Sequence, residues 1–265
     1  MNFFEKILYF LQGEMERPKS YGWFHLLWVF LTIISIIYLY KVRDTYNEKQ
    51  LKKVLAIYGI IAFILELTKQ LIWAFNYNSV TNIVTWDYEW YAAPFQLCTT
   101  PIYIALISLF LKKGKLRDNL LSYVAYITIW GSLATIIMPD SCFVKTIEVN
   151  IHTMFLHCGS FVLSIYLMFN EVKPTKKSLL GAIKTFLVFV FIALSLNFIV
   201  YHLGILDGET FNMFYISPYF ISSLPIYNKL QEILPYFIYL IFYIFSISIG
   251  GFIIYMLHKK LRKKK

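Results

Sequence analysis

The sequence predicts an all-α membrane protein with about seven transmembrane helices in one bundle. Hydrophobic residues make up 58% of the 265-residue chain and charged residues only 15%, whereas a soluble domain carries about 25% charged residues. One small globular core cannot hide so much apolar surface, so lipid is its natural environment. The net charge of +10 does not indicate a nucleic-acid partner, because the basic residues lie in short clusters between apolar runs.

Seven segments are long and apolar enough to cross a bilayer, since a span needs roughly 20 predominantly apolar residues. The third of them starts irregularly, with a proline at position 94, which disfavours a continuous helix. The seven segments are Tyr21–Tyr40, Val54–Phe75, Ala92–Leu111, Asn119–Met138, Asn150–Asn170, Leu179–Leu203 and Leu234–His258.

The N-terminal segment predicts a short amphipathic helix on the membrane surface, because its apolar residues recur at helical spacing. It does not resemble a cleavable signal, since it has two charged side chains and no long apolar centre. The chain therefore divides into an amphipathic segment at 1–20, a seven-helix domain at 21–258 and a basic tail at 259–265. The apolar residues of the first segment are Phe3, Phe4, Ile7, Leu8 and Leu11.

The basic residues also predict the orientation. Eighteen lysines and arginines lie in the loops on one side of the spans and in the C-terminal tail, against five on the other side. The positive-inside rule then puts the N-terminus outside and the C-terminus in the cytoplasm. Few of the basic residues are arginine, and Ile, Asn, Phe and Tyr are abundant. We therefore expect a multi-pass protein of a bacterial plasma membrane.

Three polar side chains on three different spans share the outer half of the bilayer. Glu66 lies about nine residues from the outer end of its span, or roughly 13 Å. His157 lies roughly 10 Å and Cys98 roughly 9 Å from theirs. Ionisable groups inside a membrane are costly and by default mark function. The other such groups are His25, Lys69, His152, Lys184 and His202.

A thiol becomes a useful nucleophile when an imidazole takes its proton and a third group orients that imidazole. Cys98, His157 and Glu66 have the chemistry for these three roles. Each also has a structural interpretation: an apolar filler, a packing hydrogen bond, and a buried ion pair with Lys69. From the residues alone, catalysis is the minority interpretation. The three cysteines are scattered and form no CxxC pair, so we expect no metal and no cofactor.

A resemblance favours catalysis. Pro94-Phe95-Gln96-Leu97-Cys98 resembles the Pro-Leu-x-Leu-Cys segment of the YwaF-like bacterial integral membrane proteins. The helix from His152 to His157 resembles the one that carries their conserved histidine. Further matches lie at 131–140, at Asn197 and at 212–218. They run in order from about Tyr21 to the end of the chain.

This family is related to the transmembrane protein 164 acyltransferases, which move a fatty acyl chain between phospholipids without coenzyme A. The resemblance implies that Cys98 is the nucleophile, His157 its base and phospholipid the partner. Glu66 falls where the family tends to carry a glutamate, and His152 remains a competing base. For substrate binding or oxyanion stabilisation we expect Gln96, Asn212, His152 and His25. Water reaching the thioester would make the protein a phospholipase instead.

The alternative is a transporter or channel-like protein with a polar path lined by Glu66, His152 and His157. Inverted repeats favour that class, and the sequence shows none. The odd number of spans also argues against two equal halves. The sequence predicts no oligomeric state.

Overall fold

The computed structural model describes residues 1–43 and 46–263 and confirms the all-α membrane bundle. In this part of the chain, six helical stretches are long and apolar enough to cross a membrane. One of them is interrupted by a π-helical turn, Val124–Thr128, between α5 and α6. The six are α2 (Trp23–Lys41), α3 (Glu48–Ala74), α5 with α6 (Lys115–Tyr123 and Ile129–Ile137), α7 (Ile147–Asn170), α8 (Lys176–His202) and α10 (Tyr236–Lys263).

The third expected span is helical only in its second half. Helix α4 covers Thr100–Phe110, and the chain before it forms a 3-10 turn at Trp90–Ala92 followed by irregular backbone. The expectation of a helix over 93–99 is therefore wrong. Proline explains the boundary, because Pro94 disfavours a helix around it while Pro101 is tolerated in the first turn of α4.

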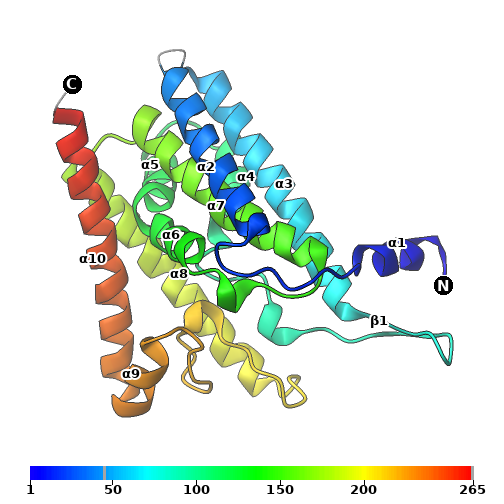
Figure 1. The fold of residues 1–265 in the computed structure, drawn as a ribbon. Helices are drawn as coiled ribbons and strands as arrows, with labels where there is room; N and C mark the ends of the chain where they lie inside the picture. Colours follow the sequence, from blue (N-terminus) through cyan, green and yellow to red (C-terminus); the bar gives the residue numbers. More distant parts are fainter. Residues whose placement is uncertain (44–45, 264–265) are drawn as a thin grey trace.

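Helix α7 lies in the middle of the bundle, with α2 and α3 on one side and α5, α6 and α8 on the other (Figure 1). The end of α2, the start of α3 and the end of α10 lie at one end of the bundle. Helix α9 (Tyr227–Ile233) and the hairpin of β1 and β2 lie at the other. The ends of the long helices thus alternate as the distribution of basic residues predicts.

The N-terminal helix forms as expected. Helix α1 covers Phe3–Leu11 and starts with a capping box between Asn2 and Glu5, a reciprocal arrangement that satisfies the free amides of the first turn. After it, the side chain of Gln12 donates hydrogen bonds to the carbonyl oxygens of Ile72 and Phe75, at 2.9 and 2.6 Å. These bonds attach the N-terminal segment to the end of α3.

The segment after α3, which the sequence suggested to be an outer loop, contains an antiparallel hairpin. Its strands are β1 (Phe75–Asn78) and β2 (Ile83–Trp86). Together with α1, the hairpin forms a small structure at the end of the bundle away from the C-terminus (Figure 1).

A buried ionic cluster ties three helices together near the basic loops; we call it the Arg117 cluster. Arg117 is 1% exposed, and its guanidinium donates to both carboxylate oxygens of Glu48 at 2.5 and 3.0 Å and to Glu171 Oε1 at 3.0 Å. The Tyr46 hydroxyl donates to the other oxygen of Glu171. Bidentate pairing of this kind is the strongest ionic contact that a side chain makes.

Candidate functional site

A second buried ionic cluster lies nearer the opposite end of the bundle; we call it the Glu66 cluster. Glu66 Oε2 lies 2.8 Å from His152 Nε2, and Glu66 Oε1 lies 2.6 Å from Lys69 Nζ. The Gln70 amide donates to Glu66 Oε1 at 2.8 Å and to the Ala92 carbonyl at 2.7 Å. The cluster therefore joins α3 to α7 and holds the irregular chain that leads to Cys98.

Three buried polar groups around this cluster have no hydrogen-bond partner among the described residues. They are both carboxylate oxygens of Glu148, Nδ1 of His152 and Nδ1 of His157. Glu148 is 7% exposed, and Glu66 and Lys69 are close enough for their charges to act on it. Buried polar atoms in native proteins are almost always paired, so this concentration of unpaired atoms marks a candidate functional site.

Glu148 was not among the expected site residues. The fifth span was expected to begin at Asn150, which left Glu148 outside it, whereas α7 begins at Ile147. The signal was present in the spacing, since Glu148 and His152 are four residues apart and so share one face of the helix.

Cys98 is a half-buried free cysteine two residues before the start of α4. The charges of Glu66 and Lys69 act on its thiol, which therefore lies near the Glu66 cluster. A helix N-terminus and a nearby cation both favour the thiolate over the thiol. Four tyrosines lie within electrostatic range of this sulfur: Tyr58, Tyr103, Tyr123 and Tyr215.

These tyrosines were also missed from sequence, where they belong to an abundant residue type. The hydroxyl groups of Tyr103 and Tyr123 bond to Pro94 and Thr100. The Tyr58 hydroxyl is buried and makes no hydrogen bond of normal geometry among the described residues, although the Ser160 side chain lies near enough to interact with it. Tyr58 therefore offers a hydroxyl near the thiol, beside that of Ser160.

His157 lies at a depth similar to that of Cys98. It is 13 residues from the end of α7 at Asn170, or roughly 20 Å, and Cys98 is 12 residues from the end of α4 at Phe110, or roughly 18 Å. Both helices end on the same side of the bundle. Among the described residues, no hydrogen bond joins His157 to Cys98 or to Glu66.

The partner of Glu66 is therefore His152 and not His157. Five residues along a helix correspond to a rotation of about 140°, so the two histidines face in different directions. The competing histidine thus takes the carboxylate, while His157 keeps an unpaired ring nitrogen.

Three other expected site residues are engaged in holding the backbone. Gln96 accepts from the Phe214 amide at 2.8 Å and donates to the Asn212 carbonyl at 3.0 Å. Asn212 accepts from the Ser217 amide at 2.8 Å and donates to the Phe220 carbonyl at 3.1 Å. Their side chains shape the loop after α8 and are not aimed at the thiol as free donors.

His25 links α2 to α6. Its Nδ1 accepts from the Tyr21 amide at 2.9 Å and its Nε2 lies 2.8 Å from the Ile136 carbonyl oxygen. Because one nitrogen accepts and the other must donate, this ring is a neutral imidazole with both positions used. Its geometry is that of a packing contact.

The loop that reaches the thiol is strained. Phe214 and Tyr215 have φ angles of 58° and 59°, a left-handed conformation that is uncommon for aromatic residues. Asn197 holds the turn by accepting from the Met213 amide at 2.7 Å and donating to its carbonyl at 3.1 Å. Strain maintained by such contacts is typical of functional sites.

The comparisons with known proteins bear on this site. A family model described as the TMEM164 family matches residues 20–258, which is nearly the whole chain. The chain belongs to the TMEM164 family. This confirms the relation that the cysteine and histidine segments indicated. No match was found among curated proteins or among solved structures.

Membership of the TMEM164 family and the six apolar helices together make the chain a multi-pass membrane protein. Within residues 1–43 and 46–263, no group of three or more His, Cys, Asp or Glu side chains is arranged to hold a metal ion.

Proposed function

We propose that this chain is a membrane-embedded lipid acyltransferase that carries an acyl group on Cys98 as a thioester and uses no coenzyme A. The observation that carries the proposal is the free thiol inside the bundle, at the start of α4 and beside the Glu66 cluster. A thiol is the most nucleophilic of the uncharged side chains. We expect the bacterial plasma membrane as its location and phospholipids as its substrates.

In the first half-reaction His157 removes the thiol proton and the Cys98 sulfur attacks the carbonyl carbon of a phospholipid ester. The ester C–O bond then breaks, the lysolipid oxygen takes the proton from His157, and a thioester remains. In the second half-reaction His157 takes the proton of an acceptor hydroxyl, whose oxygen attacks the thioester. The C–S bond breaks and the thiol is restored.

The surrounding groups support this chemistry electrostatically. The tetrahedral intermediate carries a negative charge that a fixed donor must stabilise, and the unpaired hydroxyl of Tyr58 is the donor we assign. Burial and the charge of Glu66 oppose negative charge at the sulfur and the charge of Lys69 favours it, while Glu66 keeps Lys69 and His152 in place.

An intact-mass measurement of the purified protein after incubation with phospholipid tests the proposal. We expect an acyl adduct that hydroxylamine removes and that is absent from Cys98→Ala. Cys142→Ala is the matched control, because Cys142 is half-buried like Cys98 and lies outside α4, in the turn Asp140–Cys142. An adduct that survives in Cys98→Ala would disprove the assignment of the nucleophile.

A second comparison identifies the base. His157→Ala should abolish adduct formation, whereas His152→Ala should leave slow formation because it disturbs only the partner of Glu66. If His152→Ala abolishes adduct formation and His157→Ala leaves slow formation, His152 is the base. If wild type forms no adduct and a thiol-reactive probe does not label Cys98, the acyltransferase proposal fails. Glu66, His152 and His157 would then be tested as the lining of a transport path.

A further inference from the structure

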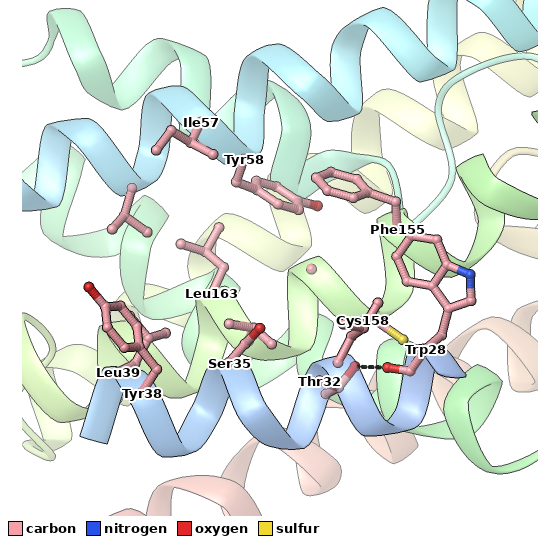
Figure 2. A pocket seen from close by; sticks show the side chains of 14 residues that line it. Trp28, Thr32, Ser35, Tyr38, Leu39, Ile57, Tyr58, Phe155, Cys158 and Leu163 are labelled. Atoms are coloured by element: carbon pink, nitrogen blue, oxygen red, sulfur yellow. Dashed lines mark hydrogen bonds between the residues drawn. The ribbon is translucent and has the colours of Figure 1, made fainter. Parts of the chain in front are cut away.

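A groove of about 320 Å³ runs between α2, α3 and α7 (Figure 2). Leu31 and Tyr38 of α2 and Ile57 of α3 line it and are also exposed on the surface of the bundle. The groove therefore opens toward whatever surrounds these helices. Because α2, α3 and α7 are long enough to cross a membrane, that surrounding is the lipid.

The lining of the groove selects an uncharged, apolar occupant. No charged side chain lines it, and its alcohol groups are few. The Thr32 hydroxyl already donates to the Trp28 carbonyl of its own helix at 2.8 Å (Figure 2). A hydrocarbon chain meets these conditions, since it needs no hydrogen bond in a region without water.

The length of the groove matches one acyl chain. Along α2 its lining extends from Trp28 to Leu39, which is roughly 16 Å at 1.5 Å per residue. The hydrocarbon of one bilayer leaflet is about 15 Å thick. Another hollow lies along α10 alone, from Phe252 to Lys260, and is not enclosed between helices.

Tyr58 connects the groove to the proposed nucleophile. Its ring lines the groove and stacks on Phe155, with centroids 6.2 Å apart and planes 14° from parallel. Its hydroxyl lies within electrostatic range of the Cys98 thiol. Gly159 permits this approach, because a Cβ at that position would lie 3.1 Å from the Tyr58 ring.

We propose that this groove binds the acyl chain that Cys98 removes from a phospholipid, and that its length sets the chain preference. The inference rests on the proposed function. Along α3, Glu66 lies eight residues, or roughly 12 Å, from Tyr58, whereas the groove lining on this helix extends from Tyr58 in the other direction to Val54. A lipid can thus keep its polar part near Glu66, its ester at the sulfur and its tail in the groove.

Filling the far part of the groove tests the proposal. Val162 lines it on α7, seven residues beyond Phe155, or roughly 10 Å. The test offers the protein an equal mixture of lauroyl and stearoyl phosphatidylglycerol. In Val162→Phe the ratio of stearoyl to lauroyl adduct on Cys98 should fall about tenfold, the discrimination that a shortened apolar pocket gives. Ser35→Phe fills the groove from α2 and should shift the ratio in the same direction.

Val188→Phe is the matched control, because it makes the same exchange on the exposed face of α8 and should leave the ratio unchanged. Thermal melting and gel filtration show which variants fold. If Val162→Phe and Ser35→Phe fold and form both adducts in the wild-type ratio, the groove does not hold the chain.

A measurement without catalysis separates this inference from the proposed function. Cys98→Ala is irradiated with a phosphatidylglycerol that carries a diazirine at the end of one acyl chain. The groove proposal predicts cross-links to α2, α3 and α7 that Val162→Phe reduces severalfold. Equal labelling of the face of α8 would mean ordinary contact with bulk lipid and would overturn the proposal. If wild type forms no thioester but the groove is still cross-linked, the proposed acyltransferase activity is disproved, whereas binding of an acyl chain in the groove is not.

Discussion

The Arg117 cluster and the Glu66 cluster are both ionic and both centred on buried side chains, although Glu48 of the first is 47% exposed, and they differ in how completely they are paired. In the first, the guanidinium holds two carboxylates, and the Tyr46 hydroxyl completes the shell of Glu171. Its one unpaired atom among the described residues is Arg117 Nε. In the second, Glu66 is fully bonded, but the neighbouring Glu148 has no partner for either oxygen.

The difference indicates different roles. A buried charge without a partner costs several kcal/mol, so a cluster that only joins helices should be satisfied. The Arg117 cluster meets that expectation at the ends of α3, α5 and α7. Unpaired atoms of Glu148, His152 and His157 remain around the Glu66 cluster, where joining helices does not account for them.

Breaking the Arg117 cluster should have the largest effect on stability. Arg117→Met leaves Glu171 buried without its cation and should lower the free energy of unfolding by about 3–5 kcal/mol. Thermal melting of the detergent-purified protein measures the loss. Lys115→Met on the exposed side of the same helix is the control. Equal losses in the two variants would contradict the structural role.

Glu66→Gln should have a smaller effect, a loss of about 1.5–3 kcal/mol, because hydrogen bonds to charged groups are worth that much. Part of this loss of stability arises because Lys69 stays buried without a negatively charged partner. The double variant Glu66→Gln with Lys69→Met removes both charges and should recover most of the stability. A double variant as unstable as the sum of the two single variants would show that the pair is not coupled.

Glu148→Gln should change stability little, by less than about 1 kcal/mol in either direction, because no hydrogen bond is lost. Formation of the acyl adduct should nevertheless slow severalfold, since an unpaired buried carboxylate is retained for function. Melting and intact-mass kinetics on the same sample separate the two effects. A large loss of stability with unchanged kinetics would place Glu148 with the structural ionic groups.

Substitution of Glu89, an acid of the segment between β2 and α4, should give the smallest change in stability. Burial, together with the charges of Glu209 and Asp87, raises the pKa of Glu89. A raised pKa in the folded state means that this carboxyl favours folding at low pH and that the contribution is lost as pH rises through the raised value. Glu89→Gln should therefore stabilise the protein at pH above that value, by at most about 0.5 kcal/mol after solvent screening.

Melting curves from acidic to mildly alkaline pH test this last prediction. Wild type and Glu89→Gln should coincide at the acidic end and separate as the pH rises. Curves that are farthest apart at the acidic end would show that the sign is wrong.

The helices could be predicted because apolar length is a local property. Six long spans and α1 follow from runs of residues that need no knowledge of their neighbours. The hairpin of β1 and β2 was missed because its strands have only four residues each. Pro94 indicated the irregular start of the third span, but the start of α4 only at Thr100 was not predicted, because the apolar composition continues upstream.

The pairings within the site could not be predicted because they join distant segments. The choice of His152 for Glu66 depends on the rotation of α7 relative to α3, which no single helix encodes. The engagement of Gln96 with residues 212 and 214 depends on the return of the chain after α8. The candidate residues were thus found by type and depth, while their partners required the fold.

The shortness of α4 has a consequence for how the protein is made. Eleven residues give roughly 16 Å, about half of the hydrocarbon thickness that a crossing must cover. A segment of this length is not recognised alone as a span, so we expect it to enter the membrane only after α3 has been inserted. Gly59 lets the two helices meet, since a Cβ there would lie 3.0 Å from Leu106. A bulky residue at Gly59 should therefore impair biogenesis, with Cys98 among the last parts of the chain to reach its place.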